Sequence, residues 1–398
     1  MAITDKEKGV WGLDQVYNKI NQGSIWEYSG ASGLFVVGTG TGYGALAQNN
    51  TTNYSSPVQI PGTTWDVPSC YVDENGGIAR KTDGTLWNWG TAGRGRLGNN
   101  DESTNYSSPI QIPGTSWSST MDHNPIGSTA GAFRTGGELW MWGYNNGGQL
   151  GINQGPGGNS GSFSSPVQII GTQWSSGCSA NGTTAAIRTD GTLWMWGHNS
   201  QGPLAQNNRT QYSSPTQVPG TTWANIQISS NSVGAIKTDG TLWGWGACGY
   251  GVLGNNESNT LTARSSPVQV GSDTTWDSGE GKFSKGHLNC SAVKTDGTLW
   301  TWGAGWYGAL GDPSIPHGSH RSSPVQVPGT TWNQVSSGTY NTFATKTDGT
   351  LWTWGYNLRG TLGHNNTTNY SSPTQVTGSW GAYVMGGQNG SAVFEGNI

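Results

Sequence analysis

Short runs of alternating apolar and polar residues, separated by turn-forming residues, recur along residues 30–398. The clearest run is Leu-Trp-x-Trp, as at Leu86–Trp89. Because successive side chains of a strand point to opposite faces, Leu and x share one face and both tryptophans the other. The preceding Lys-Thr-Asp-Gly-Thr predicts a hairpin, since Asp-Gly favours a tight turn between two strands.

These runs belong to a repeat of about 50 residues. Ser-Ser-Pro occurs seven times, 49 to 57 residues apart, with prolines at Pro57, Pro109, Pro166, Pro215, Pro267, Pro324 and Pro373. Pro-Val-Gln-Val/Ile predicts a short strand that begins at its proline, where no ladder donor is needed. A third signature, Gly-Thr-x-Trp, adds one tryptophan per repeat. One such unit cannot bury its apolar faces alone, so neighbouring units must stack.

The two ends of the repeat region predict how the stack closes. Residues 30–38 align with Thr-Asp-Gly-Thr-Leu-Trp-x-Trp-Gly, with Phe35 and Val37 in place of the tryptophans, so the first copy begins in mid-repeat. Residues 389–397 align with the strand before that turn. Pairing near Phe35 and Val393 would complete one blade and remove an exposed sheet edge. We therefore predict an all-β fold, a closed seven-bladed β-propeller over residues 30–398.

Residues 1–29 lie outside the repeat. A helical stripe of apolar residues predicts a helix of about ten residues, too short to be stable alone. It either packs on its own propeller or docks onto a neighbouring subunit or partner, and we predict the latter, with a short N-terminal helical docking segment. The docking residues are Trp11, Leu13, Val16, Tyr17, Ile20 and Trp26.

Composition and charge argue against several classes of protein. Only 10% of the residues are charged and the net charge is −4, so the chain has no broad basic surface for nucleic acid. No run of about 20 apolar residues predicts a membrane-inserted helix, and the first residues lack the apolar core of a signal peptide. The 66 glycines would suit disorder, but 22 tryptophans favour packed structure.

Leu-Trp-x-Trp-Gly followed by Asn-x-x-Gly-x-Leu-Gly, best seen at Trp140–Gly151, resembles the repeat of the regulator-of-chromosome-condensation family of seven-bladed propellers. That family includes a guanine-nucleotide exchange factor that docks on chromatin and a bacterial inhibitor of β-lactamases. The resemblance implies a rigid disc with variable rim loops, and it does not fix a function.

Residues 9–26, with Trp-x-Leu-x-x-x-Tyr followed by Gly-x-x-Trp, resemble a short element of structural proteins of tailed bacteriophages. This resemblance implies a non-enzymatic virion protein of the tail, baseplate, fibre or head. Its expected partners are other virion proteins or further copies of itself, with a host surface glycan or protein as a candidate receptor. The alternative is a soluble bacterial propeller that binds or inhibits another protein, or a lectin-like carbohydrate binder.

We find no catalytic motif and predict neither cofactor nor metal. His317 and His320 form an isolated pair on a loop, and the acids of the Asp-Gly turns are explained by turn formation. The four scattered cysteines are expected to be small buried thiols. Loops after Trp-Gly vary between repeats, and their arginines and aromatic residues are types enriched at binding surfaces. The candidate loop residues are Arg94, Arg96, Tyr250, Trp306, Tyr307 and Arg359.

Overall fold

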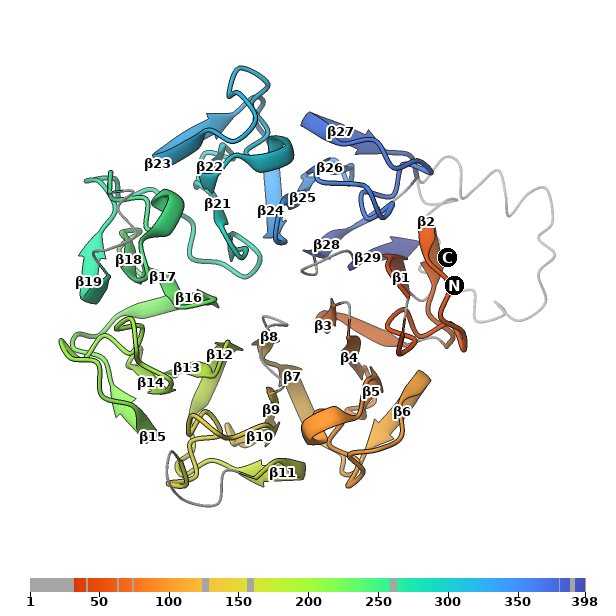
Figure 1. Cartoon of the computed structure of the whole chain (residues 1–398), viewed down its shortest axis with the longest axis vertical. Coiled ribbons are helices and arrows are strands. Elements are labelled where there is room, and N and C mark those ends of the chain that lie inside the picture. Colours follow the sequence, from red (N-terminus) through yellow and green to blue (C-terminus); the bar gives the residue numbers. More distant parts are fainter. Residues whose placement is uncertain are drawn as a thin grey trace, which may run out of the picture. The chain divides into compact units, whose positions relative to one another are not determined.

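The computed structural model describes residues 32–40, 42–62, 64–73, 75–123, 129–155, 161–257, 263–378, 380–386 and 391–397. Strands in these ranges form seven sheets, six of four strands and one of five. Figure 1 shows the sheets arranged around a common centre, toward which one strand of each sheet lies. The chain is therefore an all-β propeller, and the described ranges hold three short 3-10 helices and no α-helix. The predicted helix within residues 1–29 lies outside these ranges.

Four blades follow the chain in simple order from one edge to the other. The first of these contains β3 (Trp65–Asp73), β4 (Gly76–Lys81), β5 (Leu86–Gly90) and β6 (Tyr106–Ile112). Next come β16 (Trp223–Ser229), β17 (Ser232–Lys237), β18 (Leu242–Gly246) and β19 (Arg264–Gln269), then β20 (Phe283–Lys285), β21 (Asn289–Val293), β22 (Leu299–Ala304) and β23 (His320–Val327). The last contains β24 (Trp332–Ser337), β25 (Asn341–Lys346), β26 (Leu351–Gly355) and β27 (Tyr370–Val376).

Two further blades share the short strand β8 (Asp122–His123). In the chain β8 follows a strand of the first of these blades, but it pairs in parallel with a strand of the second, opposite Cys178 and Ser179. The first of the two contains β7 (Trp117–Thr120), β9 (Thr129–Arg134), β10 (Leu139–Gly143) and β11 (Phe163–Gln168). The second contains β12 (Trp174–Ala180), β13 (Thr183–Arg188), β14 (Leu193–Gly197) and β15 (Tyr212–Gln217). The 3-10 helices are η2 (Gly93–Gly95), η3 (Gly249–Gly251) and η4 (Trp306–Gly308).

The remaining blade is assembled from both ends of the repeat region, in the order β2-β1-β29-β28. Its strands are β1 (Ser32–Gly38), β2 (Tyr54–Gln59), β28 (Trp380–Gly386) and β29 (Ser391–Asn397). β1 and β29 are antiparallel from Ser32 opposite Asn397 to Gly38 opposite Ser391, and Val36 stands opposite Val393. The two strands thereby supply each other's backbone partners, which an open sheet edge would lack.

The Asp-Gly hairpins form as predicted, and side-chain hydrogen bonds hold their turns. In the β4–β5 hairpin, the Thr85 backbone N–H donates to Asp83 Oδ1 at 2.9 Å, and the Thr85 hydroxyl donates to the same oxygen at 2.6 Å. Trp87 Nε1–H then donates to Thr85 Oγ1 at 2.8 Å. The bonds from Thr85 lower the pKa of Asp83, because they stabilise the carboxylate. The Asp83 carboxylate therefore orients Thr85, which in turn accepts the hydrogen bond of Trp87.

The Ser-Ser-Pro segments form the outer strand of each blade. β6 begins at Tyr106, three residues before Pro109, whereas the sequence predicted that the strand begins at the proline. β6 is an edge strand, so the missing proline N–H costs no ladder hydrogen bond. The Ser107 carbonyl accepts a hydrogen bond from the Asn49 N–H of the adjacent blade at 2.7 Å. The residues before the proline therefore help to join two blades.

Each tryptophan-rich blade core holds three indoles beneath one cation. In the β16–β19 blade, Trp223 meets Trp243 and Trp245 edge to face, with ring centroids 6.2 and 5.8 Å apart. Lys237 Nζ lies 4.7 Å from the Trp223 ring centroid and 4.5 Å from that of Trp243. Such contacts contribute about 0.5–2 kcal/mol each. The half-buried Lys or Arg that precedes each hairpin turn thus packs on the tryptophans of its blade.

The second tryptophan of each Leu-Trp-x-Trp strand joins its blade to the preceding one. Its indole N–H donates to a backbone carbonyl there at 2.6–3.2 Å: Trp89 to Ala45, Trp142 to Arg96, Trp196 to Gln149, Trp245 to Pro203, Trp302 to Val252 and Trp354 to Ala309. The blade of β1 has no indole at this position. There the Asn365 N–H donates to the Ser55 carbonyl of β2 at 2.9 Å.

Candidate functional site

Three of the loop residues singled out from the sequence lie on 3-10 turns that follow Trp-Gly. Tyr250 is in η3, and Trp306 and Tyr307 are in η4. Tyr250 and Tyr307 have φ of 60° and 57°, a left-handed conformation that is uncommon for residues other than glycine. The glycine after each tyrosine lies against the next blade, since a Cβ on Gly308 would meet Ser371 Cα at 2.4 Å. Close packing on that blade therefore fixes the loop tips.

The structure brings these residues into one group, here called the aromatic loop cluster. It comprises Tyr250, Trp306, Tyr307, His317, His320, Tyr340 and Tyr356, from three adjacent blades.

Ring contacts run through the whole aromatic loop cluster. The Trp306 ring lies 4.9 Å from Tyr250 and 5.5 Å from Tyr340, measured between centroids. Tyr307 in turn lies 5.5 Å from Tyr340 and 4.9 Å from Tyr356. All four contacts are edge to face, the arrangement favoured by the ring quadrupoles. Each of these side chains is half-buried, so the rings support one another and remain accessible to solvent.

The electrostatics of the aromatic loop cluster are those of neutral groups. Burial raises the pKa of Tyr340, and the phenols of Tyr307 and Tyr250 raise it further, so these hydroxyls lie within electrostatic range of one another. Burial lowers the pKa of His320, which keeps its imidazole uncharged at neutral pH. None of the seven residues is a carboxylate, a lysine or an arginine. The phenols, the indole and the His320 imidazole of the cluster therefore carry no formal charge at neutral pH.

The arginines predicted with them are not among these seven residues. Arg94 is exposed on η2, on the β3–β6 blade, with its guanidinium carbon 4.2 Å from the Tyr144 ring centroid. Arg96 is half-buried beside it and offers its backbone carbonyl to Trp142. Arg359 is exposed on the loop after Tyr356. The predicted docking residues Trp11, Leu13, Val16, Tyr17, Ile20 and Trp26 lie outside the described ranges.

Sequence reasoning did not assign four members of the aromatic loop cluster to a binding surface: His317, His320, Tyr340 and Tyr356. Tyr340 lies in the turn before β25, where the β4 and β17 turns have Asn75 and Asn231. The Tyr356 N–H donates to the Tyr340 carbonyl at 2.9 Å, which places the two side chains side by side. His320 begins β23, and His317 lies three residues earlier in the Pro/Gly-containing loop before that strand. The usable signal for Tyr340 was an aromatic residue at a turn position that Asn, Gly or Leu occupies in other blades, at Asn75, Gly182, Asn231 and Leu288.

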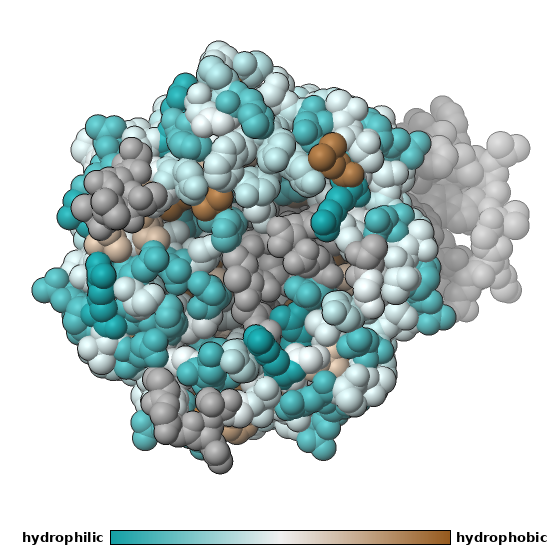
Figure 2. All heavy atoms as spheres, viewed as in Figure 1, coloured by the Kyte–Doolittle hydropathy of each residue, from teal (hydrophilic) through white to brown (hydrophobic). Residues whose placement is uncertain are grey.

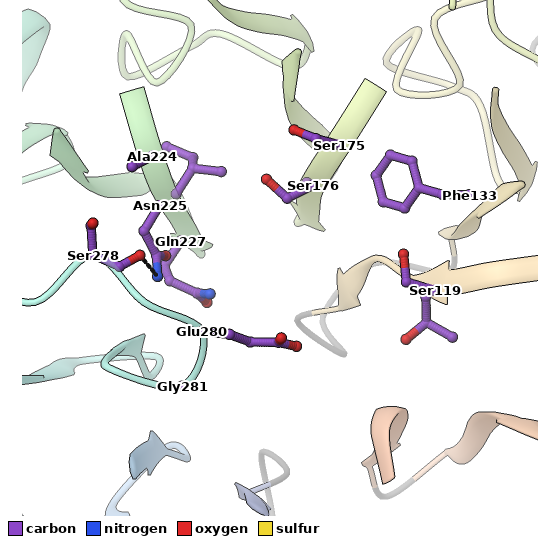
Figure 3. Close-up of a pocket in the computed structure, with 13 residues that line it drawn as sticks. Ser119, Phe133, Ser175, Ser176, Ala224, Asn225, Gln227, Ser278, Glu280 and Gly281 are labelled. Atoms are coloured by element: carbon purple, nitrogen blue, oxygen red, sulfur yellow. Dashed lines mark hydrogen bonds between the residues drawn. The ribbon is translucent and has the colours of Figure 1, made fainter. Parts of the chain in front are cut away.

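A separate pocket lies on the inner strands β7, β12 and β16, with a cavity of about 210 Å³. Figure 3 shows the Glu280 side chain pointing into it from the loop before β20, toward Ser119. Asn225 Nδ2–H donates to the Gly279 carbonyl at 3.0 Å and holds that loop in place. The pocket is lined mainly by serines and amides, with the buried Phe133 at one side. None of the residues of the aromatic loop cluster lines it.

Other potentially reactive groups are structural. All four cysteines are free and buried, as predicted. Lys285 is 4% exposed, and its Nζ–H donates to the Val252 carbonyl and to Cys290 Sγ, both at 3.1 Å. Burial raises the pKa of the Cys290 thiol, so the group stays protonated. Within the described ranges no three His, Cys, Asp or Glu side chains are grouped to hold a metal ion. The same ranges contain no helix with the length and apolar character to cross a membrane.

Comparison with known proteins agrees with the repeat. Residues 296–345 and 348–392 match the regulator of chromosome condensation (RCC1) repeat, and residues 332–361 match a second description of that repeat. The chain is an RCC1-repeat β-propeller. The stretches that match the repeat include Tyr340 and the tryptophans of β26. Part of the aromatic loop cluster therefore lies within matched RCC1 repeats.

Relatives of the RCC1-repeat chain are diverse. It is 29% identical over 317 residues to the ultraviolet-B receptor UVR8 of Arabidopsis thaliana, covering 75% of this chain and 67% of UVR8. It is 26% identical over 346 residues to the mitochondrial RCC1 domain-containing protein RUG3 of the same plant, covering 78% and 75%. A match to BTB/POZ domain-containing protein 1 of Schizosaccharomyces pombe, 32% identical, spans 30% of this chain and 9% of that protein.

Solved structures share the fold. Human WBSCR16 superposes with a TM-score of 0.77 at 18% identity, covering 92% of this chain and 99% of that one. Prp20p of Saccharomyces cerevisiae gives a TM-score of 0.78 at 18% identity, covering 93% and 92%. At this identity the likeness establishes the fold alone.

Proposed function

We propose that the chain is a non-enzymatic structural protein of a tailed bacteriophage virion, whose propeller presents the aromatic loop cluster as a binding surface. The cluster carries the proposal, because half-buried tyrosine and tryptophan side chains on rigid loops are the groups most enriched at binding hot spots. The virion role is supported by the resemblance of residues 9–26 to phage structural proteins. Residues 1–29 would then dock the propeller onto other virion proteins.

We further infer that the seven sheets are the blades of one closed ring. The supporting contacts are the pairing of β1 with β29, the six indole hydrogen bonds between consecutive blades, and the bond from Asn365 to Ser55. A closed ring holds loops from different blades at fixed separations. That rigidity lowers the entropy cost of binding a partner at the aromatic loop cluster.

Mass spectrometry of purified virions tests the assembly role. The protein should be present at a fixed copy number per particle, and its absence from clean particles would contradict the proposal. Deletion of residues 1–28 should leave a folded propeller that no longer joins the particle. A large loss of thermal stability in that truncation would instead show that the segment packs on its own propeller.

Adsorption to host cells tests the binding surface. Particles that carry Trp306→Ala should adsorb more slowly than wild type, whereas particles that carry Tyr43→Ala, altered in the corresponding loop of another blade, should adsorb like wild type. Tyr43 follows a glycine and precedes Gly44-Ala-Leu, in parallel with Tyr250 before Gly251-Val-Leu, and it is 44% exposed. Equal adsorption of both variants and wild type would remove the aromatic loop cluster as the binding surface.

A further inference from the structure

We propose that the aromatic loop cluster binds a neutral carbohydrate, with pyranose rings stacked on Trp306 and its neighbouring tyrosines. This inference rests on the proposed function, because it assigns a ligand class to the same surface. Its support comes from the free hydrogen-bonding groups of the cluster, its lack of charge and its rigidity.

Trp306 differs from the other tryptophans in the described ranges. Each of the others occupies one of the three tryptophan positions of the repeat and packs within its blade. The first tryptophan of each Leu-Trp-x-Trp strand is also half-buried, but its indole N–H donates to the Thr or Glu side chain two residues earlier. Trp306 lies on η4 and is half-buried, and within the described residues its indole N–H makes no hydrogen bond. A tryptophan with both an accessible ring and a free donor is suited to a ligand that has apolar C–H faces and hydroxyl edges.

The tyrosine hydroxyls show the same contrast. Tyr54, Tyr212 and Tyr370 accept hydrogen bonds from asparagine side chains of their own loops, at 3.0–3.1 Å. In the aromatic loop cluster, Tyr250 and Tyr340 make ring contacts but no hydroxyl hydrogen bond with any described residue. These phenols each keep one donor and two acceptor sites for a ligand. Sugar hydroxyls, which both donate and accept, match that inventory.

Charge favours a neutral ligand over an anionic or cationic one. The cluster has no carboxylate, lysine or arginine side chain, and the His320 imidazole is neutral because burial lowers its pKa. The adjacent Arg321 is half-buried and donates from Nη1 to the His320 carbonyl at 3.1 Å. Bringing a charged group onto the rings would therefore cost desolvation without a paired counter-charge from the cluster. A neutral hexose polymer avoids that cost.

Rigidity supports binding by a shallow surface. A Cβ on Gly251 would meet Ser322 Cα at 2.6 Å, and one on Gly308 would meet Ser371 Cα at 2.4 Å. The tips that carry Tyr250 and Tyr307 are thus held against the next blade before any ligand arrives. Little conformational entropy is left to lose on binding, which favours stacking of sugar rings on an open platform.

Titration calorimetry of the full-length protein with neutral gluco-, manno- and galacto-oligosaccharides tests the proposal. A uronic-acid oligosaccharide of equal length serves as the charged comparison. At least one neutral series should bind, and Trp306→Ala should weaken that binding at least tenfold. Trp306→Phe should lose less, because it keeps a stacking face, and Tyr43→Ala should bind like wild type. Circular dichroism verifies that each variant is folded.

Two results would overturn the carbohydrate assignment. One is that no neutral oligosaccharide binds, and the other is that binding persists unchanged in Trp306→Ala. If adsorption to host cells still depends on Trp306 in either case, the surface binds a partner of another class and the proposed function stands. If adsorption does not depend on Trp306 while neutral sugars do bind there, the carbohydrate site is real but is not the host-binding surface.

Discussion

The indole hydrogen bonds between blades predict a difference between two equivalent tryptophans. Trp196 and Trp245 are both 0% exposed and occupy the same repeat position. Trp196 Nε1–H donates to the Gln149 carbonyl at 2.9 Å, and that carbonyl also accepts from Thr184 Oγ1 at 2.8 Å. Trp245 Nε1–H donates to the Pro203 carbonyl at 2.6 Å, which accepts no other hydrogen bond from a described residue.

Replacing either tryptophan by phenylalanine removes the same atoms but leaves different acceptors behind. The smaller ring should cost about 1–2 kcal/mol at both positions through lost burial and a residual cavity. At position 196 the Gln149 carbonyl keeps its bond from Thr184. At position 245 the Pro203 carbonyl becomes a buried acceptor without a partner, which costs about a further 1–2 kcal/mol. We therefore expect Trp245→Phe to be the more destabilising variant by about 1 kcal/mol or more.

Equilibrium urea unfolding, followed by far-ultraviolet circular dichroism, measures the difference. The midpoint should fall for both variants and fall further for Trp245→Phe, with similar slopes so that midpoints compare directly. Since Val233 occupies the position of Thr184 in the next blade, Val233→Thr should recover part of the loss in the Trp245→Phe background. Equal midpoints for the two single variants would refute the assignment of the difference to the orphaned carbonyl.

Three other perturbations test the fold. Deleting residues 391–397 removes β29 and exposes the edge of β1, so size-exclusion chromatography should show aggregation. An unchanged monomer peak and melting curve would contradict ring closure by this strand. Gly98→Ala should lower the melting temperature more than Gly271→Ala. Both glycines have positive φ, but only a Cβ at position 98 would meet a buried indole nitrogen, at 2.7 Å. Equal shifts in melting temperature would exclude this steric cause. Hydrogen bonds from Lys294 and Thr275 lower the pKa of Asp273 to about 2. The resulting stability is present above pH 4 and is lost as pH falls through 2. Asp273→Asn should therefore cost about 1 kcal/mol at pH 7, after allowance for partial exposure, and the gap from wild type in urea midpoint should narrow steadily as the pH falls from 4 to 2.

The blade is largely a property of the sequence. Asp-Gly turns, alternation in Leu-Trp-x-Trp and the complementary ends near Phe35 and Val393 are local or periodic signals, and each depends on neighbours that the repeat itself specifies. The strand boundary at Ser-Ser-Pro was misplaced by three residues, because tolerance of proline depends on β6 being an edge strand. Edge position is set by the sheet and has no local sequence mark.

The candidate site depends on tertiary structure instead. Tyr250, Trp306 and Tyr307 stand out in the sequence because they depart from the repeat, yet nothing local indicates that they meet. They meet Tyr340 because adjacent blades bring a post-tryptophan loop against the turn before the next inner hairpin, 33 residues along the chain from Tyr307. The pocket around Asn225 likewise joins strands from separate repeats. Periodicity therefore determines each blade, whereas the packing of successive blades around the centre decides which exceptional residues share a surface.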